Sequence, residues 1–136
     1  MQENQKQEEI IIPCVTNNGN DASFFSEKNI TLNGDDQRML SEQISAVNFR
    51  LRNSGSSYES DWHVAGDPTL LIILSGCVQI ELRNGQCKEF KAGEMFVAQD
   101  YLQKGAEFNQ SLGHRARVLG DEKIHVLHLK LSKQGG

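Results

Sequence analysis

Apolar and polar side chains alternate along most of the chain after its first third, a pattern that predicts β-strands. In the segment 44–52, Val47, Phe49 and Leu51 alternate with mostly polar or small residues. Because successive side chains of a strand point to opposite faces, this segment is expected to have one mainly apolar face. Residues 70–74 are continuously apolar, which is typical of a strand that is covered on both faces.

Strict alternation at residues 78–83 predicts a strand whose inward side chains are Val78, Ile80 and Leu82. Asn84-Gly85 follows at once, and this pair is the favoured sequence of a two-residue type I′ hairpin turn. The remaining segments are predicted as strands at 86–90, 94–98, 115–119 and 123–131, with a long loop at 100–113. Turn residues recur roughly every eight to twelve positions, which indicates an antiparallel sandwich or barrel with little helix.

The first third of the chain has weaker signals. Residues 1–9 are polar or charged without periodicity and are expected to form a flexible arm. The apolar residues 10–12 stop at a proline, which indicates a short edge strand. Residues 16–25 are rich in turn-forming types and predict a loop. A brief helical turn is considered at residues 35–40, capped by its first residue.

The composition describes one small acidic domain. The chain has 136 residues, 14 Lys and Arg against 18 Asp and Glu, and a formal net charge of −4. We expect the domain at residues 10–132 and a frayed tail at 133–136. The lack of a basic run argues against nucleic-acid binding, and no stretch reaches the about 20 apolar residues that cross a bilayer. Three cysteines without a C-x-x-C pair favour a cytoplasmic setting over a disulfide or zinc scaffold.

Between residues 58 and 128 the sequence resembles the cupins, small β-barrels of the jelly-roll type. The residues that carry the resemblance are SDWH at 60–63 with the apolar strand 70–76, NG at 84–85 with FKAGEMFVA at 90–98, and GHRARV at 113–118. They are similar, in order, to the first cupin motif, to the hairpin that joins the two motifs, and to the segment with the last metal histidine. The resemblance implies an all-β, cupin-type jelly-roll barrel.

The sequence departs from the metal-binding members of the family. Those members usually carry His-x-His and then Glu in the first motif, whereas here Ala65 stands at the second histidine and Thr69 or Leu70 at the glutamate. Of the usual ligands only His63 and His114 remain. Both are candidate catalytic residues, because an imidazole can ligate a divalent metal or act as general acid or base near neutral pH.

The parity of residues 114–118 bears on His114. On a strand His114 would share one face with Ala116 and Val118, and would point inward. This placement suits a metal ligand or a proton shuttle, and it equally suits a core histidine with satisfied hydrogen bonds. For His63 the alternative is likewise structural, a histidine at the start of a strand that bonds a neighbouring loop.

Two further residues could complete a metal site with these histidines. His125 shares its face of the last strand with three leucines and is expected to point into the barrel, whereas His128 is expected outside. Asp100 ends a predicted strand and is the leading candidate for a carboxylate ligand, although it could equally cap the following loop. The ion would be Fe, Zn, Mn or Ni.

Tyr58, Trp62 and Phe96 are candidate pocket residues for an apolar or aromatic ligand, unless they simply fill the barrel. Extra residues at 101–112 would alter the barrel mouth. The resemblance implies a small-molecule-binding protein and leaves three alternatives open. The first is a metal-dependent oxygenase, isomerase or lyase that acts on a small organic acid. The second is a non-catalytic binding or sensing protein, and the third is a metal-free acid–base catalyst like the sugar epimerases. It also implies a homodimer formed through exposed strands, which unpaired sheet edges favour independently.

Overall fold

The computed structural model describes residues 5–19 and 21–133, and every regular element among them is a β-strand. The strands are β1 (Lys6–Thr16), β2 (Phe24–Gly34), β3 (Met39–Leu40), β4 (Ala46–Ser54), β5 (Thr69–Ser75), β6 (Cys77–Leu82), β7 (Cys87–Lys91), β8 (Met95–Ala98), β9 (His114–Leu119) and β10 (Ile124–Leu131). These residues form no helix long and apolar enough to cross a membrane. Of the tail predicted at 133–136, all but the first residue lie outside the described chain.

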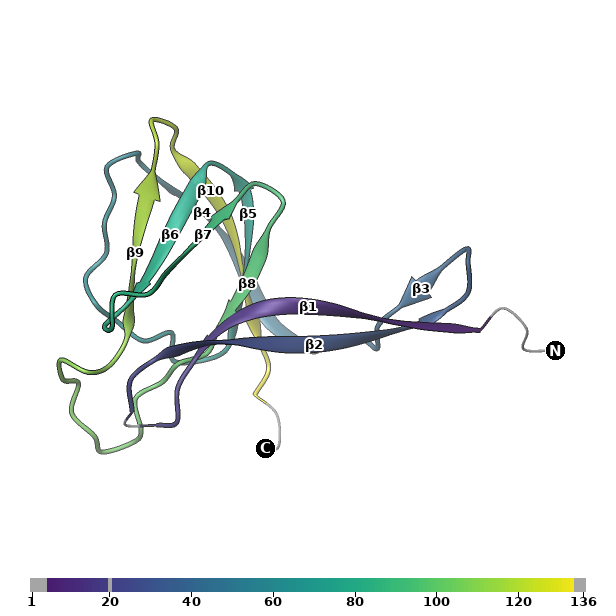
Figure 1. Cartoon of the computed structure of the whole chain (residues 1–136), viewed down its shortest axis with the longest axis horizontal. Coiled ribbons are helices and arrows are strands. Elements are labelled where there is room, and N and C mark those ends of the chain that lie inside the picture. Colours follow the sequence, from purple (N-terminus) through teal and green to yellow (C-terminus); the bar gives the residue numbers. More distant parts are fainter. Residues whose placement is uncertain (1–4, 20, 134–136) are drawn as a thin grey trace.

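The ten strands form two sheets (Figure 1). The larger sheet has the order β3-β2-β1-β8-β5-β10-β4, and the smaller has the order β7-β6-β9. All ladders are antiparallel except the short parallel contact between β1 and β8. The predicted all-β jelly-roll fold is confirmed by this arrangement, and the predicted loop at 100–113 contains no strand.

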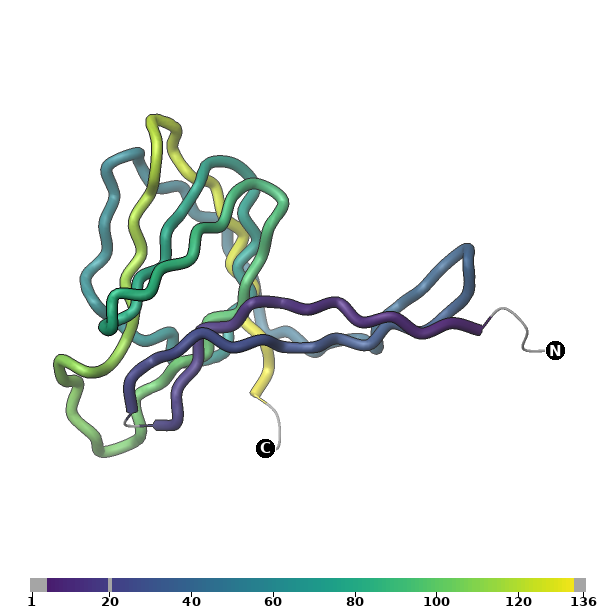
Figure 2. The backbone as a smooth tube through the Cα atoms, viewed as in Figure 1, coloured from purple at the N-terminus to yellow at the C-terminus, as the bar shows by residue number. Residues whose placement is uncertain are grey.

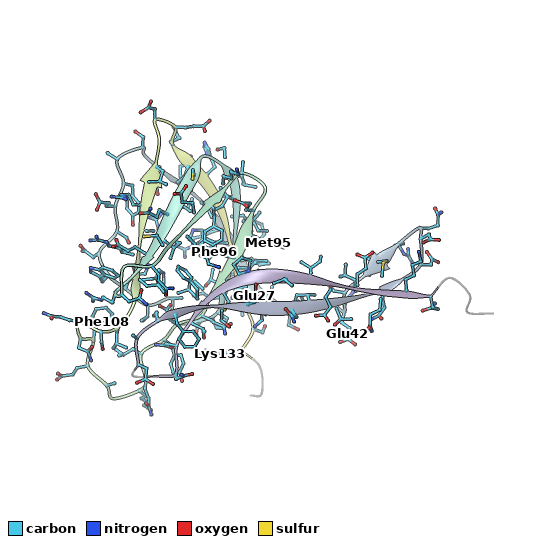
Figure 3. All side chains as sticks on the ribbon, viewed as in Figure 1. Glu27, Glu42, Met95, Phe96, Phe108 and Lys133 are labelled. Carbon is cyan, nitrogen blue, oxygen red and sulfur yellow. The ribbon has the colours of Figure 1, made fainter. Side chains whose placement is uncertain are left out.

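The hydrophobic core lies between the two sheets. Its main cluster takes Ile73 and Phe96 from the larger sheet and Ile80 and Leu82 from the smaller one. Phe96 stacks on Phe90 of β7 with ring centroids 4.3 Å apart, and Figure 3 shows Phe96 inside the body of the fold. The alternation along β6 therefore buries the face that the sequence predicted.

The first strands form a long hairpin that projects from the body (Figures 1 and 2). β1 and β2 pair along all eleven residues of each strand, and only the end of β1, at Cys14 and Val15, pairs with β8. The β1–β2 hairpin and β3 are called the arm from here on. The flexible arm predicted at residues 1–9 is wrong from Lys6 onward, because hydrogen bonds to β2 fix these residues; residues 1–4 lie outside the described chain.

Two turns differ from their predictions. The helical turn considered at residues 35–40 is instead the turn between β2 and β3, in which Asp35 Oδ1 accepts hydrogen bonds from the backbone N–H groups two and three residues later, at 2.9 and 3.2 Å. The hairpin predicted at Asn84-Gly85 is confirmed, but its turn is not of type I′. That type needs positive φ at both residues, and only Gly85 has it, at 92°.

One face of the seven-stranded sheet, called the outer face from here on, points away from the core. Ile73 of β5 faces the core and is 1% exposed, whereas the next residue, Leu74, faces outward and is 52% exposed. The prediction that β5 is covered on both faces is therefore wrong at Leu74, whereas Leu70 on the same face packs against the buried cluster of Ile12, Cys14 and Val97. An apolar row crosses four strands on the outer face, where the strand registers align Leu51, Leu127, Ile72 and Met95.

Candidate functional site

A cavity of about 240 Å³ lies between the two sheets. Most of its walls are apolar core side chains. Its polar lining residues are Arg52, Ser54, Tyr58, Ser60, His63, Thr69, His114 and His128. The volume is slightly below the roughly 300–1,000 Å³ of typical ligand pockets, so the cavity suits a small ligand.

The two candidate catalytic histidines meet at this cavity. The segment before β5 runs beside β9, and the backbone N–H groups of His63 and His114 each donate to the other's carbonyl oxygen at 2.9 Å. Gly113 permits this approach, because its φ is +88° and a Cβ there would lie 2.7 Å from the carbonyl oxygen of His63. The two rings are consequently neighbours, with centroids 4.6 Å apart.

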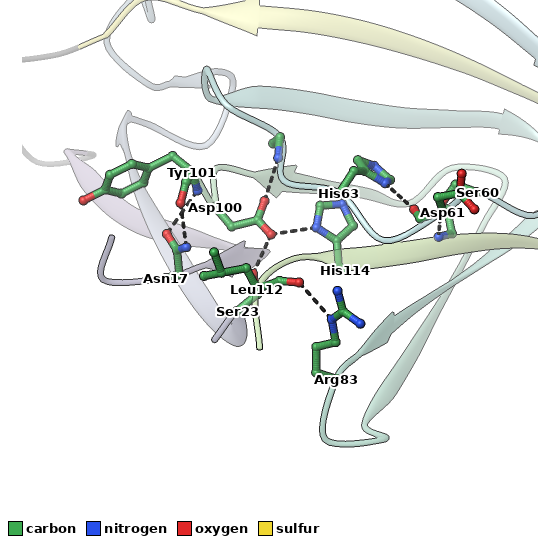
Figure 4. Close-up of polar contacts among 12 residues, drawn as sticks. Asn17, Ser23, Ser60, Asp61, His63, Arg83, Asp100, Tyr101, Leu112 and His114 are labelled. Atoms are coloured by element: carbon green, nitrogen blue, oxygen red, sulfur yellow. Dashed lines mark hydrogen bonds and ion pairs between the residues drawn. The ribbon is translucent and has the colours of Figure 1, made fainter. Parts of the chain in front are cut away.

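Asp100 lies directly behind His114, and its side chain is fully buried (Figure 4). Its Oδ2 accepts hydrogen bonds from Nδ1 of His114 at 2.7 Å and from Oγ of Ser23 at 2.6 Å, and its Oδ1 accepts one from the backbone N–H of Ala65 at 2.9 Å. Burial alone would raise the pKa of Asp100, but the bonds from these three donors together lower it below the ordinary value. Asp100 is therefore a carboxylate at neutral pH.

These partners determine which ring nitrogens carry protons. A carboxylate oxygen only accepts hydrogen bonds, so Nδ1 of His114 carries the proton that faces Asp100. The backbone carbonyl of Asp61 accepts in the same way from Nδ1 of His63, at 2.8 Å. Within the described chain, neither Nε2 has a hydrogen-bond partner. When the rings are neutral, each Nε2 is consequently a free acceptor.

The surroundings of His63 and His128 keep both imidazoles neutral. Desolvation lowers the pKa of His63, and the neighbouring His114 and Arg52 lower it further against the opposing bond to the Asp61 carbonyl. Desolvation also lowers the pKa of His128, with Arg52 and Arg50 adding to the effect. At neutral pH His63 and His128 are therefore uncharged.

Arg52 supplies the positive charge at the exposed side of the cavity. Its guanidinium lies 4.8 Å from the ring centroid of Tyr58, and its Nε donates to Oγ of Ser54 at 3.2 Å. None of the ion pairs found among the described residues involves Arg52. The guanidinium is thus oriented by neutral neighbours and is available to an anionic ligand.

Two of the three predicted pocket residues line the cavity, and the third does not. Tyr58 and Phe96 are lining residues. Trp62 instead lies outside, between two guanidinium groups: Arg83 at 4.2 Å and Arg115 at 4.8 Å from its ring. The chain bends at Trp62, so Trp62 turns away from the cavity, whereas His63, which is itself exposed to solvent, contributes to the lining.

The predicted metal ligands do not assemble. His125 is absent from the cavity lining, which contains His128 instead, because the leucines that share the face of His125 lie on the outer face. Both oxygens of Asp100 are occupied by donors. Among residues 5–19 and 21–133 no three His, Cys, Asp or Glu side chains are grouped to hold an ion. Two imidazoles without a third protein ligand do not fit a zinc or ferrous site.

Several residues of the site carried no signal in the sequence. Ser23 lies in a segment predicted as a loop and reaches Asp100 only through the fold. Arg52 stands in an ordinary alternating strand.

The 101–112 segment is held beside the body because Arg83 donates to the carbonyl oxygen of Leu112 at 2.9 Å and Asn17 to that of Tyr101 at 2.8 Å.

Comparison with known proteins gives structural neighbours only. No protein-family model and no curated protein matches the chain. A cupin-2 domain containing protein from Shewanella frigidimarina is similar with 26% identity over 62% of this chain and 69% of that chain, at a TM-score of 0.41. The cupin domain of Schizosaccharomyces pombe Cnp3 is similar with 11% identity, 93% and 88% coverage and a TM-score of 0.47. A cupin domain from Bordetella pertussis gives 10% identity, 90% and 94% coverage and a TM-score of 0.43.

The fold follows from the chain's own features. Two facing sheets enclose the cavity, the predicted hairpin joins β6 to β7, and histidines from the segment before β5 and from the start of β9 meet at the cavity wall. The motifs on which the sequence resembles the cupins occupy these places in the same order. The chain therefore has the fold of a small single-domain cupin.

Proposed function

We propose that the cavity binds a small organic acid and that His114, backed by Asp100, exchanges a proton with it without a metal ion. The observation that carries this proposal is the 2.7 Å bond between Nδ1 of His114 and the buried carboxylate of Asp100. A carboxylate in this position fixes the tautomer and stabilises the imidazolium that forms when Nε2 takes up a proton. Among the alternatives weighed from the sequence, this geometry favours acid–base chemistry of the epimerase type.

The charges of the lining residues support an anionic ligand. Arg52 is the cationic group at the exposed side, and no carboxylate is among the lining residues. The apolar part of the wall lowers the local dielectric constant, which strengthens the interaction of a bound anion with the polar lining groups. A carboxylate near Arg52 would leave the rest of a small ligand facing the two histidines.

The reaction proposed is proton abstraction from a carbon next to a carbonyl group. The C–H bond breaks, its proton moves to Nε2 of His114, and the electron pair moves to the carbonyl oxygen to form an enolate. Return of the proton to either face regenerates the free base and gives the starting compound or its epimer. His63, neutral and adjacent, presents an unprotonated Nε2 and is placed to accept a second proton.

Solvent exchange tests this function without knowledge of the natural substrate. A panel of small 2-oxo and 3-oxo carboxylates is incubated with the protein in D2O, and loss of the α-proton signal is followed by proton NMR. We expect accelerated exchange for at least one compound, a loss of about 10²–10⁴-fold in His114→Gln, and a higher KM in Arg52→Gln.

His125→Gln is the matched control, because His125 lies outside the cavity and should leave exchange unchanged. Equal exchange rates in the wild type and His114→Gln would contradict the acid–base role. If a compound instead raises the Tm of the wild type but no exchange occurs, the chain binds the acid without catalysis, and only the binding half of the proposal stands.

A further inference from the structure

The cavity lies against the face of the seven-stranded sheet opposite the outer face, called the inner face from here on. The strand registers align Arg52 of β4 with Val126 of β10 and Ile73 of β5 on this face, and all three residues line the cavity. Because β4 is the last strand of the sheet (Figure 1), this row of side chains ends at an arginine.

A second arginine ends the neighbouring row. Side chains two residues apart on a strand point to the same face, so Arg50 shares the inner face with Arg52. Its partner on β10 is His128, which stands opposite Leu71 of β5, and Leu71 in turn stands opposite Phe96 of β8. These three partners all line the cavity. Arg50 is therefore one cross-strand position beyond the lining, where Cβ atoms are about 4.5–5.5 Å apart.

The charges of both arginines are free to act at this edge. They help to lower the pKa of His128, which indicates that both guanidinium groups lie near the imidazole that joins Arg50 to the cavity. Neither Arg50 nor Arg52 takes part in an ion pair found among the described residues. The carboxylate of Asp67, which lies farther along the same side of β10, is paired with two lysines at 3.0 and 3.8 Å.

We propose that the acid bound in the cavity is a dicarboxylate whose second carboxylate lies beside Arg50, at the edge of the inner face. This inference rests on the acid-binding cavity proposed above and adds a second anionic subsite to it. The first carboxylate would lie near Arg52, within the lining. The neutral His128 lies between the two positions, so a single small ligand can reach both.

The spacing of the two arginines favours two carboxylates over one doubly charged phosphoryl group. Their Cα atoms are about 7 Å apart at the usual rise of a strand. The guanidinium of Arg52 is also directed away from Arg50, since its Nε donates to Ser54, farther along β4, and its plane lies near the ring of Tyr58. A phosphoryl group would need both guanidinium groups at one point, whereas two carboxylates separated by one or two carbons can each take one.

Isothermal titration calorimetry at pH 8 with two acids of the same chain length tests the inference. Hexanoate has one carboxylate, and 2-propylsuccinate is hexanoate with a second carboxylate on its third carbon. In both acids the alkyl chain can occupy the apolar part of the cavity. We expect the wild type to bind 2-propylsuccinate about 3- to 10-fold more tightly than hexanoate, the gain typical of one partly exposed ion pair.

Arginine variants assign this gain to its subsite. Arg50→Gln should weaken 2-propylsuccinate to the affinity of hexanoate and leave hexanoate unchanged, whereas Arg50→Lys, which keeps the charge, should retain most of the gain. Arg52→Gln should weaken both acids. Arg117→Gln is the matched control, because it removes the same unit charge from an exposed arginine outside the lining, and it should retain the full gain. Circular dichroism verifies that each variant is folded.

The outcomes separate this inference from the proposed function. Equal affinities of the wild type for the two acids would overturn the second subsite and leave the binding of an acid in the cavity intact. A gain that persists in Arg50→Gln, or that is lost equally in Arg117→Gln, would also overturn the subsite. If the wild type binds neither acid, the acid-binding cavity is contradicted and this inference falls with it.

Discussion

The replacement Asp100→Asn tests whether Asp100 determines the proton position on His114. Asparagine keeps one oxygen, which can still accept the bond from the backbone N–H of Ala65. Its amide nitrogen only donates, so it cannot accept the proton that Nδ1 of His114 now directs at Oδ2. The neutral imidazole should therefore move its proton to Nε2 and accept a hydrogen bond at Nδ1.

The same contacts give the magnitude of the effect on stability. Asp100→Asn removes a hydrogen bond between the imidazole and an ionised group, and such bonds contribute about 1.5–3 kcal/mol. For a domain of this size, 1 kcal/mol corresponds to about 4 °C, so the Tm should fall by roughly 6–12 °C. Asp100→Ala should cost more, about 3–5 kcal/mol, because three donors lose their acceptor.

Long-range proton–nitrogen correlation NMR of the histidine side chains at pH 8 measures the tautomer directly. The wild type should show His114 protonated at Nδ1, and Asp100→Asn should show it protonated at Nε2. Ser23→Ala is the matched control: it removes another donor to Oδ2 and should keep the wild-type tautomer. The reasoning is refuted if His114 of the wild type is protonated at Nε2, or if its tautomer is the same in Asp100→Asn.

Three further predictions concern stability. The fold lowers the pKa values of His63 and His128, so below about pH 6.5 the unfolded chain binds more protons at these residues than the folded chain does. The free energy of unfolding should therefore decrease as the pH falls from about 6.5 toward the lowered pKa values. Equal urea midpoints at pH 7.5 and 5.5 would contradict this prediction. Gly113→Ala should lower the Tm, because the alanine Cβ would lie 2.7 Å from the carbonyl oxygen of His63 in a backbone with φ at +88°. An unchanged melting curve would show that the segments around His63 and His114 can separate without cost. Phe96→Ala should cost about 3–5 kcal/mol in urea unfolding with an unchanged m value, and a loss below 1 kcal/mol would mean that the stack on β7 is not part of the core.

The parts of the site that were predicted correctly depend on short-range pattern. The alternation at residues 114–118 placed His114, Ala116 and Val118 on one inward face, and all three line the cavity. The sequence of a six-residue strand is enough to predict which side chains point inward when one face has small or apolar residues and the other has arginines. Gly113, directly before His114, lacks the Cβ that would clash with the backbone of His63.

The partners of these histidines could not be predicted, because they come from distant segments. Ser23 is separated from Asp100 by 77 residues and Ala65 by 35, and no periodicity relates such positions. Asp100 was predicted as a ligand because it ends a strand near the site. The fold assigns it another role, because both oxygens of its side chain accept hydrogen bonds from protein donors.

The reversed assignment of His125 and His128 has the same origin as the bare outer face. Three leucines share the face of His125, and a pattern argument takes the more apolar face of a strand as the inner one. In β10 both faces are apolar, since Ile124 and Val126 face the core while Leu127 and Leu129 face outward. An apolar pattern therefore does not by itself identify which face of a strand is turned toward the core. The same pattern predicted cover on both faces of β5, and Leu74 of that strand is instead 52% exposed on the outer face.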